Sequence, residues 1–164
     1  MNDATDLPRS GMPESIERLE EMPAFLEAAL DAVPDDELTS RPSAGEFSLT
    51  EQACHLRDLE REGYLVRVRR MLAEREPALE PFDGGAVAAA RDYPRQDAFA
   101  AAREFAAARA ESLALIARLT PEELAREGRF GEQRVCFADV IAMMVAHDGE
   151  HREEMSRLLA GIGS

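Results

Sequence analysis

The strongest constraint on the fold is the recurrence of apolar residues every three or four positions in four long stretches, at about 13–33, 49–74, 96–119 and 137–159. This spacing places the apolar side chains on one face of an α-helix. Most of the apolar residues are Ala and Leu, which favour helix over strand, and only 5% of the chain is aromatic. Four such helices in a chain of 164 residues predict an all-α, single-domain four-helix bundle.

The connections between these stretches are long. Residues 75–95 contain three Pro and two Gly, and we expect them to form a pocket wall with one short helix at about 86–91. Residues 120–136 begin with TPEEL, which predicts a short capped helix, and continue with a short extended pair. We therefore expect a bundle that departs from the simplest up-down-up-down order, with residues 1–12 as a flexible N-terminus and 13–164 as one domain.

Two local signals concern the ends and the continuity of the helices. The sequence SLTE predicts a capping box, in which Ser48 and Glu51 each bond a free backbone amide at the start of the second helix. Pro23 interrupts the first stretch, and it predicts either a kink or a division into two short helices.

Charge and hydropathy exclude two classes of partner. The chain has 19 basic and 33 acidic residues, a net charge of −14 that would repel a nucleic acid backbone. The longest apolar run, VIAMMVA at 140–146, is too short to span a bilayer, and the N-terminal residues do not form a signal peptide. We expect a cytoplasmic protein that binds neither nucleic acid nor membrane.

The segment AHDGEHREEM carries two of the three histidines. His147 and His151 are four residues apart, and they continue an apolar stripe that includes Met144 and Met155. Buried imidazoles need partners, because an unsatisfied buried polar group costs about 1–3 kcal/mol. Hydrogen bonds to core neighbours would meet that need, and so would a metal ion.

The third histidine lies on another helix. By the helical periodicity, His55 shares a broad face with Leu59 and Val66, and a pairing of the two helices could bring it opposite the 147/151 pair. Three converging neutral imidazoles suit Zn²⁺, Ni²⁺, Fe²⁺ or Co²⁺. The sequence therefore predicts a divalent transition-metal site.

The same segment also matches H-x-x-E-H, the motif of inverted zinc proteases, in which Glu150 would activate water. That motif needs a third ligand from a later element, and 13 residues follow His151. We expect no further ligand helix there, so the protease interpretation is disfavoured.

Two segments resemble the DinB/YfiT-like family of metalloenzymes. RPSAGEFSLTEQACHLRDLE at 41–60 is similar to the GEWS-like start and H-L-x-D-x-E segment of that family, and AHDGEHREEM is similar to its H-x-x-x-H segment. The resemblance extends from about residue 14 to 160 and implies a four-helix bundle whose metal ligands are His55, His147 and His151. One departure is Phe47, where the family commonly has Trp.

The resemblance implies a metal-dependent enzyme acting on a small molecule. Three histidines leave coordination positions open, as in catalytic sites. Characterised relatives include transferases and isomerases that use the low-molecular-weight thiols mycothiol or bacillithiol, which predicts an S-transferase or isomerase. The alternatives are a hydrolase that uses metal-activated water and a non-catalytic bundle that binds a partner or forms a homodimer.

No catalytic residue is assigned, but four residues near the triad have candidate roles. Asp58 could orient His55, and Arg109 could hold a carboxylate of a thiol at the mouth of the bundle. Glu150 or Asp148 could act as a base. For each of these side chains, the alternative is a solvated surface position.

One further residue, Gly149, has no role in this scheme. Glycine inside a helix costs roughly 0.5–1 kcal/mol relative to alanine. We therefore predict that its missing side chain allows another element to approach the site.

Overall fold

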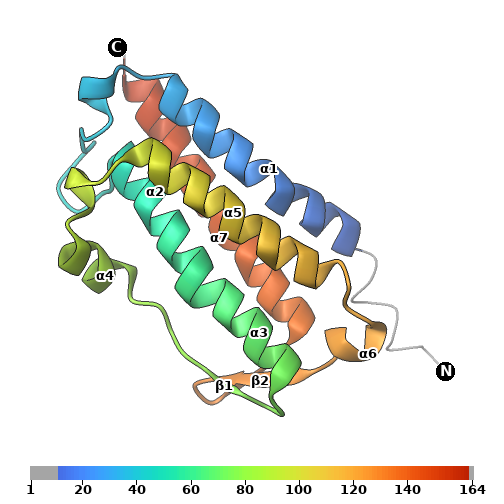
Figure 1. Cartoon of the computed structure of the whole chain (residues 1–164). Helices are drawn as coiled ribbons and strands as arrows, with labels where there is room; N and C mark the ends of the chain where they lie inside the picture. Colours follow the sequence, from blue (N-terminus) through green and yellow to red (C-terminus); the bar gives the residue numbers. More distant parts are fainter. Residues whose placement is uncertain (1–10, 163–164) are drawn as a thin grey trace.

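A computed structural model describes residues 11–162, and four long helical elements form its framework (Figure 1). The first, third and fourth are α1 (Met12–Asp31), α5 (Ala98–Ile116) and α7 (Phe137–Gly161). The second is continuous and consists of α2 (Leu49–Asp58), the π-helical turn η2 (Leu59–Tyr64) and α3 (Leu65–Ala73). The predicted four-helix bundle is confirmed, whereas most of the proposed flexible N-terminus, 1–12, lies outside the described residues.

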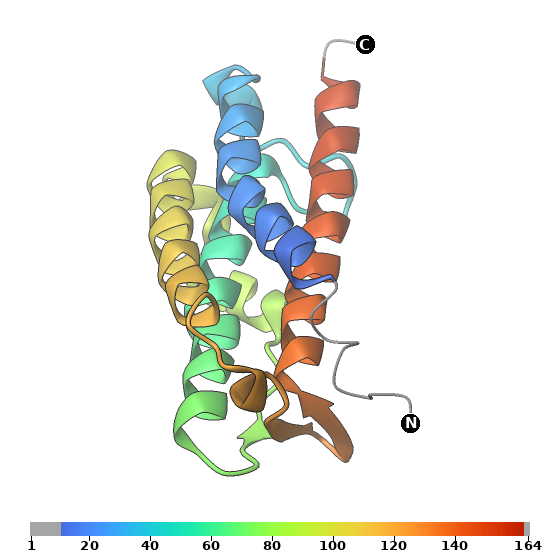
Figure 2. The same ribbon diagram turned by 90° about the vertical axis from the view of Figure 1, so that its right-hand side faces the viewer.

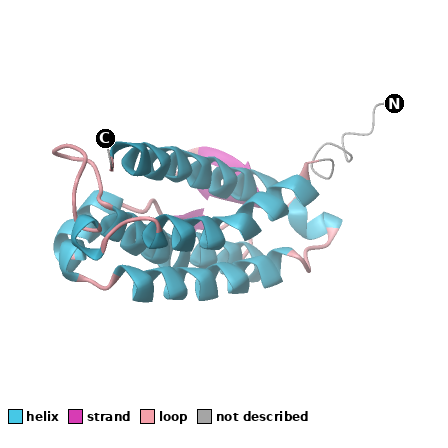
Figure 3. Cartoon of the chain, turned by 90° about the horizontal axis from the view of Figure 1, so that it is seen from above, coloured by secondary structure: helices cyan, strands magenta, loops and turns pink. Residues whose placement is uncertain are grey.

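The connections carry the shorter elements. These are η1 (Asp35–Glu37), α4 (Gly84–Arg91), η3 (Tyr93–Arg95) and α6 (Pro121–Leu124), with the strands β1 (Ala78–Leu79), β2 (Glu127–Phe130) and β3 (Gln133–Cys136). β2 and β3 form the predicted extended pair, and β1 adds to β2 in parallel. Figure 3 shows that the strands are confined to this small sheet and that helices form the rest of the regular structure.

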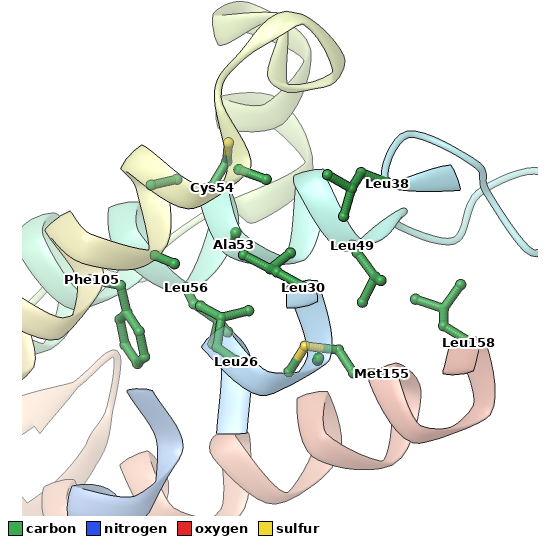
Figure 4. Close-up of a cluster of buried hydrophobic side chains, with 14 of the residues drawn as sticks. Leu26, Leu30, Leu38, Leu49, Ala53, Cys54, Leu56, Phe105, Met155 and Leu158 are labelled. Carbon is green, nitrogen blue, oxygen red and sulfur yellow. The ribbon is translucent and has the colours of Figure 1, made fainter. Parts of the chain in front are cut away.

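Two apolar clusters fill the bundle. One surrounds Leu26, Leu56 and Met155 and is shown in Figure 4. The other includes Val68 and Met144. On α7 the two histidines lie between Met144 and Met155, and therefore between the two clusters.

The predicted capping box at the start of α2 is present. The backbone amide of Glu51 donates to Oγ of Ser48 (3.2 Å), and the amide of Ser48 donates to the carboxylate of Glu51 (2.9 Å). These bonds satisfy free amides of the first turn and set the start of the helix that carries His55.

The π-helical turn changes which residues of the second helix face the core. The prediction that Val66 shares the buried face with His55 and Leu59 is wrong, because Val66 is 40% exposed whereas Leu65 and Val68 are buried. A π turn adds one residue to the helix, so the residues after it are rotated by about 100° from regular helical periodicity. The insertion moves Arg67, which is buried, into the position that simple periodicity gives to Val66.

Pro23 lies inside α1, which remains a single helix and changes direction along its length (Figure 2). Proline has no backbone N–H, so the carbonyl of Leu19, four residues earlier, loses its partner within the helix. Nη1 of Arg109 donates to that carbonyl (2.9 Å). A side chain from α5 thus stabilises the interruption in α1. None of the helices within 11–162 is long and apolar enough to cross a membrane.

Candidate metal centre

The three histidines of the chain converge inside the bundle, and we call them the histidine cluster (His55, His147 and His151). His55 comes from α2 and the other two from α7. The ring centroids of His147 and His151 are 4.3 Å apart, and His55 lies 5.5 and 4.8 Å from them. One ring nitrogen from each residue lies within 4.8 Å of the other two. The structure therefore brings together all three predicted ligands.

Burial keeps these imidazoles neutral. It lowers the pKa of His55 to about 4, with a further contribution from the charge of His147. Burial also lowers the pKa of His147 to about 4 and that of His151 to about 3. Neutral imidazole is the form that binds a metal ion, so the cluster is in its ligand form at neutral pH.

His151 has a defined tautomer. Its Nδ1–H donates to Oε1 of Gln52 (2.6 Å), and an oxygen of Glu154 lies 3.2 Å from the same nitrogen. The amide nitrogen of Gln52 in turn donates to Glu154 (2.7 Å). This arrangement leaves the Nε2 lone pair of His151 directed toward His147 and is typical of the outer shell of metal-bound histidines.

The hydrogen-bonding capacity of the histidine cluster fits a cation. The Nε2 atoms of His147 and His151 are 3.1 Å apart, and two lone pairs at that distance need either a shared proton or an ion between them. The Nδ1 atoms of His55 and His147 are buried and have no partner among the described residues. No cysteine or carboxylate within 11–162 joins the group. Three imidazole nitrogens alone suit a divalent transition metal.

The wall around His55 is aromatic and closely packed. Phe47 and Phe82 have ring centroids 5.5 and 6.1 Å from that of His55. Gly84, the first residue of α4, is so close that a Cβ there would lie 2.6 Å from Cε1 and 2.9 Å from Nδ1 of the imidazole. The long connection 75–95 therefore supplies part of the wall, and only glycine fits at its closest point to the ring.

A cavity of about 210 Å³ opens beside His151. Gln52 and Phe47 line it together with two carboxylates, those of Glu46 and Glu154. No Lys or Arg contributes to this lining. The approach to the histidine cluster is therefore partly apolar and partly acidic.

Arg109 is not at the mouth of the bundle, so the predicted role in holding a thiol is wrong. It is 1% exposed, and it forms an ion-paired group with Glu60 and Asp148 that we call the arginine cluster. Its two terminal nitrogens donate to both oxygens of Asp148 (2.7 and 3.0 Å) and to Glu60 (3.0 Å). Burial alone would lower the pKa of Arg109, but the bonds and charges of its two partners raise it above the ordinary value.

The arginine cluster also corrects the proposed role of Asp148. This side chain is buried and its oxygens accept from Arg109, so it is neither solvent-facing nor free to act as a base. Together with the bond to Leu19, the group joins α1, η2, α5 and α7.

The prediction that Asp58 orients His55 directly is wrong, because no hydrogen bond joins the two side chains. Its carboxylate accepts from Arg57 (2.8 Å) and from the buried hydroxyl of Tyr93 (2.7 Å). The ring of Tyr93 packs against Phe47, with centroids 6.4 Å apart. Asp58 thus supports His55 through the aromatic wall, and its negative charge acts to raise the pKa of that imidazole against the effect of burial.

The predictions for Glu150 and Gly149 have different outcomes. Glu150 is exposed on the outer side of α7, which does not suit the water-activating residue of a protease motif. The proposed close approach at Gly149 is wrong, because a Cβ there would meet nothing within 4 Å. The close approach occurs at Gly84, a residue that the sequence analysis placed in the long connection without assigning a role.

Comparisons with known proteins agree with this architecture. A family model of the DinB superfamily matches residues 18–155. YfiT from Bacillus subtilis, described as a probable metal-dependent hydrolase with an unusual four-helix bundle topology, superposes with a TM-score of 0.86 at 22% identity over 94% of this chain and 89% of YfiT. A DinB-like protein of Bacillus subtilis, YjoA, has a TM-score of 0.62 at 12% identity over 92% and 93%. At these identities the structural likeness concerns the fold. A search of curated proteins found no match.

Proposed function

Since the chain belongs to the DinB superfamily, we propose that it is a metal-dependent hydrolase that acts on a small molecule at the histidine cluster. The observation that carries this proposal is the convergence of three neutral imidazoles, two buried and that of His147 half-buried, with all three donor nitrogens within 4.8 Å of one another. A divalent ion such as Zn²⁺, Ni²⁺ or Fe²⁺ held by three imidazoles keeps open positions, where it lowers the pKa of water and polarises a carbonyl.

The surrounding residues have separate tasks in this proposal. Gln52 and Glu154 hold the Nδ1 proton of His151 and so direct Nε2 inward. Phe47 and Phe82 keep the imidazole of His55 in place and exclude water from one side of it. The cavity beside His151 admits the substrate.

The likeness to YfiT and the position of Arg109 favour hydrolysis over thiol transfer. The cavity beside His151 is lined by Glu46 and Glu154 and by no Lys or Arg. Arg109, the predicted partner of an acid-bearing thiol, is occupied by Glu60 and Asp148. YfiT, which shares the fold, is described as a probable metal-dependent hydrolase. S-transfer or isomerisation with mycothiol or bacillithiol is the alternative.

The metal is tested first, by elemental analysis of purified wild type and of the variants His55→Ala, His147→Ala and His151→Ala. We expect one ion per wild-type chain and a large loss in every variant. Glu150→Ala is the matched control on α7, since this exposed neighbour of His151 should leave the metal in place. Wild type without a stoichiometric metal would contradict the proposal.

The reaction is tested with a panel of esters, amides and lactones. We expect hydrolysis that stops when the metal is chelated, returns when it is restored, and is kept by Glu150→Ala. The same protein is incubated with an electrophile and a panel of low-molecular-weight thiols, and the products are examined by mass spectrometry. Metal-dependent conjugation without hydrolysis would support the transferase and overturn the hydrolase.

A further inference from the structure

Arg67, on α3, is a buried cation without a counter-ion. The residue is 5% exposed, and no carboxylate within the described part of the chain lies at ion-pairing distance from it. Nη2 donates to the carbonyl of Glu80 (3.0 Å), whereas Nε is buried and has no partner among residues 11–162. A buried charge is ordinarily paired, because removal from water strongly disfavours an isolated ion. The guanidinium therefore has unused capacity to bind an anion.

Two aromatic rings hold this guanidinium. Its central carbon lies 5.1 Å from the centroid of Tyr64 and 4.8 Å from that of Phe130. Cation–π contacts stabilise a desolvated arginine but leave its N–H donors free. The rings thus keep the charge in a dry place without neutralising it.

The same Tyr64 links Arg67 to the histidine cluster. The ring of Tyr64 lies 6.2 Å from that of His147 and 5.1 Å from the guanidinium. The positive charge of Arg67 also contributes to the lowered pKa of His147. Arg67 is therefore close enough to bind one end of a small molecule whose other end is at the histidines.

We propose that Arg67 binds the carboxylate of the substrate that is hydrolysed at the histidine cluster. The free Nε–H donates to a carboxylate oxygen, and the aromatic rings limit competition by water. This inference rests on the proposed function and narrows its substrate class to short esters, amides or lactones that also carry a carboxylate. The acidic cavity beside His151 and the cation beside His147 then orient the substrate in one direction.

The experiment uses acetate as the anion and acetamide as its neutral counterpart of the same shape. Each is titrated into the full-length protein labelled with ¹⁵N, in metal-free and zinc-loaded form, while the arginine Nε–H resonances are recorded. The resonance of Arg67 is assigned by its disappearance in Arg67→Lys. We expect a saturable shift of that resonance with acetate in both forms of the protein, and none with acetamide.

Variants separate this site from other anion sites. Arg67→Met should weaken acetate binding by about tenfold or more, the loss expected for a charge-assisted hydrogen bond. Arg69→Met removes an exposed arginine from the same helix and should leave acetate binding unchanged. If Arg67→Met does not fold, the comparison of acetate with acetamide in wild type decides.

Three results would overturn the inference: no saturable shift, an equal shift with acetamide, or acetate binding that persists in Arg67→Met. The metal-free titration separates this outcome from that of the proposed function. Loss of the metal site alone would leave an acetate-binding Arg67, and loss of the anion site alone would leave a protein with its metal.

Discussion

The histidine cluster and the arginine cluster are both buried polar groups on facing helices, but they differ in how well they are satisfied. Arg109 donates four hydrogen bonds, three of them to carboxylate oxygens and one to a backbone carbonyl. In the histidine cluster the Nδ1 atoms of His55 and His147 lack partners within 11–162, and two Nε2 atoms face each other at 3.1 Å. The charge of Arg109 is balanced by two carboxylates, although its Nε and one oxygen of Glu60 have no partner within 11–162. The histidine cluster contains no such complementary group, and a metal ion would supply one.

This difference separates structural from functional polar residues better than burial or charge does. Arg109 and Arg67 are both nearly inaccessible arginines, at 1% and 5% exposure. Nε has no partner among residues 11–162 in either arginine. Arg109 has two carboxylate partners and joins helices, whereas Arg67 has only a backbone carbonyl and two aromatic rings. The set of partners, rather than the residue type, indicates which of the two is available to a ligand.

Breaking the arginine cluster should have the largest effect. Arg109→Met leaves Glu60 and Asp148 buried without a cation, and we expect the free energy of unfolding to fall by about 3–5 kcal/mol. Urea denaturation followed by circular dichroism measures the change. Replacing all three members with apolar residues should recover much of the loss. A decrease of less than about 1 kcal/mol in the single variant would show that the cluster does not hold the bundle together.

Acid should destabilise the metal-free protein through the histidine cluster. The pKa of His55 is about 4 in the folded chain, against about 6.5 when unfolded, so below pH 6.5 the unfolded state binds a proton that the folded state does not. Stability is therefore full above about pH 6.5 and falls toward pH 4, by on the order of 3 kcal/mol for this residue alone. Denaturation in EDTA between pH 7 and 4 measures the slope.

The matched variant for this pH dependence is His55→Gln. In this variant, the decrease in the free energy of unfolding between pH 7 and 4 should be smaller by the contribution of one histidine. An unchanged slope would mean that other groups control the acid sensitivity.

Much of the fold was predictable because it depends on local signals. Helical periodicity, the SLTE capping box and the turn residues gave the four helices, the short helix at 121–124 and the hairpin. The triad was predictable because His147 and His151 continue an apolar stripe. The π turn was not predictable, because no clear sequence signal marks it. It turns Val66 from the buried to the exposed side of the helix.

Contacts between segments that are far apart in the chain could not be predicted from the sequence either. Arg109 looks like a surface residue until Glu60, Asp148 and the carbonyl freed by Pro23 are brought to it. Gln52 and Gly84 lie on helices whose contact with the site depends on tertiary packing. Among these, Pro23 offered the best signal, because it implies a free carbonyl four residues earlier.

The side chains that hydrogen-bond the histidine cluster should affect metal affinity more than the stability of the fold. Gln52→Leu removes the acceptor for Nδ1 of His151 and the donor to Glu154. We expect metal affinity to fall by about 10–100-fold, as is typical when an outer-shell partner is lost. Competition with a chromophoric chelator measures the dissociation constant. Affinity equal to that of wild type would show that His151 needs no such support.

Gly84 and Gly149 both lie near the histidines, and substituting them should have smaller effects that differ between the two positions. An added Cβ at Gly84 would lie 2.6 Å from Cε1 of His55, so Gly84→Ala must displace the imidazole or α4. We expect metal binding to weaken by roughly tenfold, at the lower end of the effect of disturbing a ligand's orientation. The same chelator competition tests it, and unchanged affinity would mean that α4 moves freely instead.

Gly149 is the counterpart without contacts. It lies between the two histidines of α7, and an added Cβ would have nothing within 4 Å. Gly149→Ala should therefore raise the free energy of unfolding by about 0.5–1 kcal/mol, through the better helix propensity of alanine, and leave metal affinity unchanged. Urea denaturation and chelator competition give the two values. Weakened metal binding would imply that the glycine serves a motion of α7 that this structure does not display, and the distinction between the two glycines would then be lost.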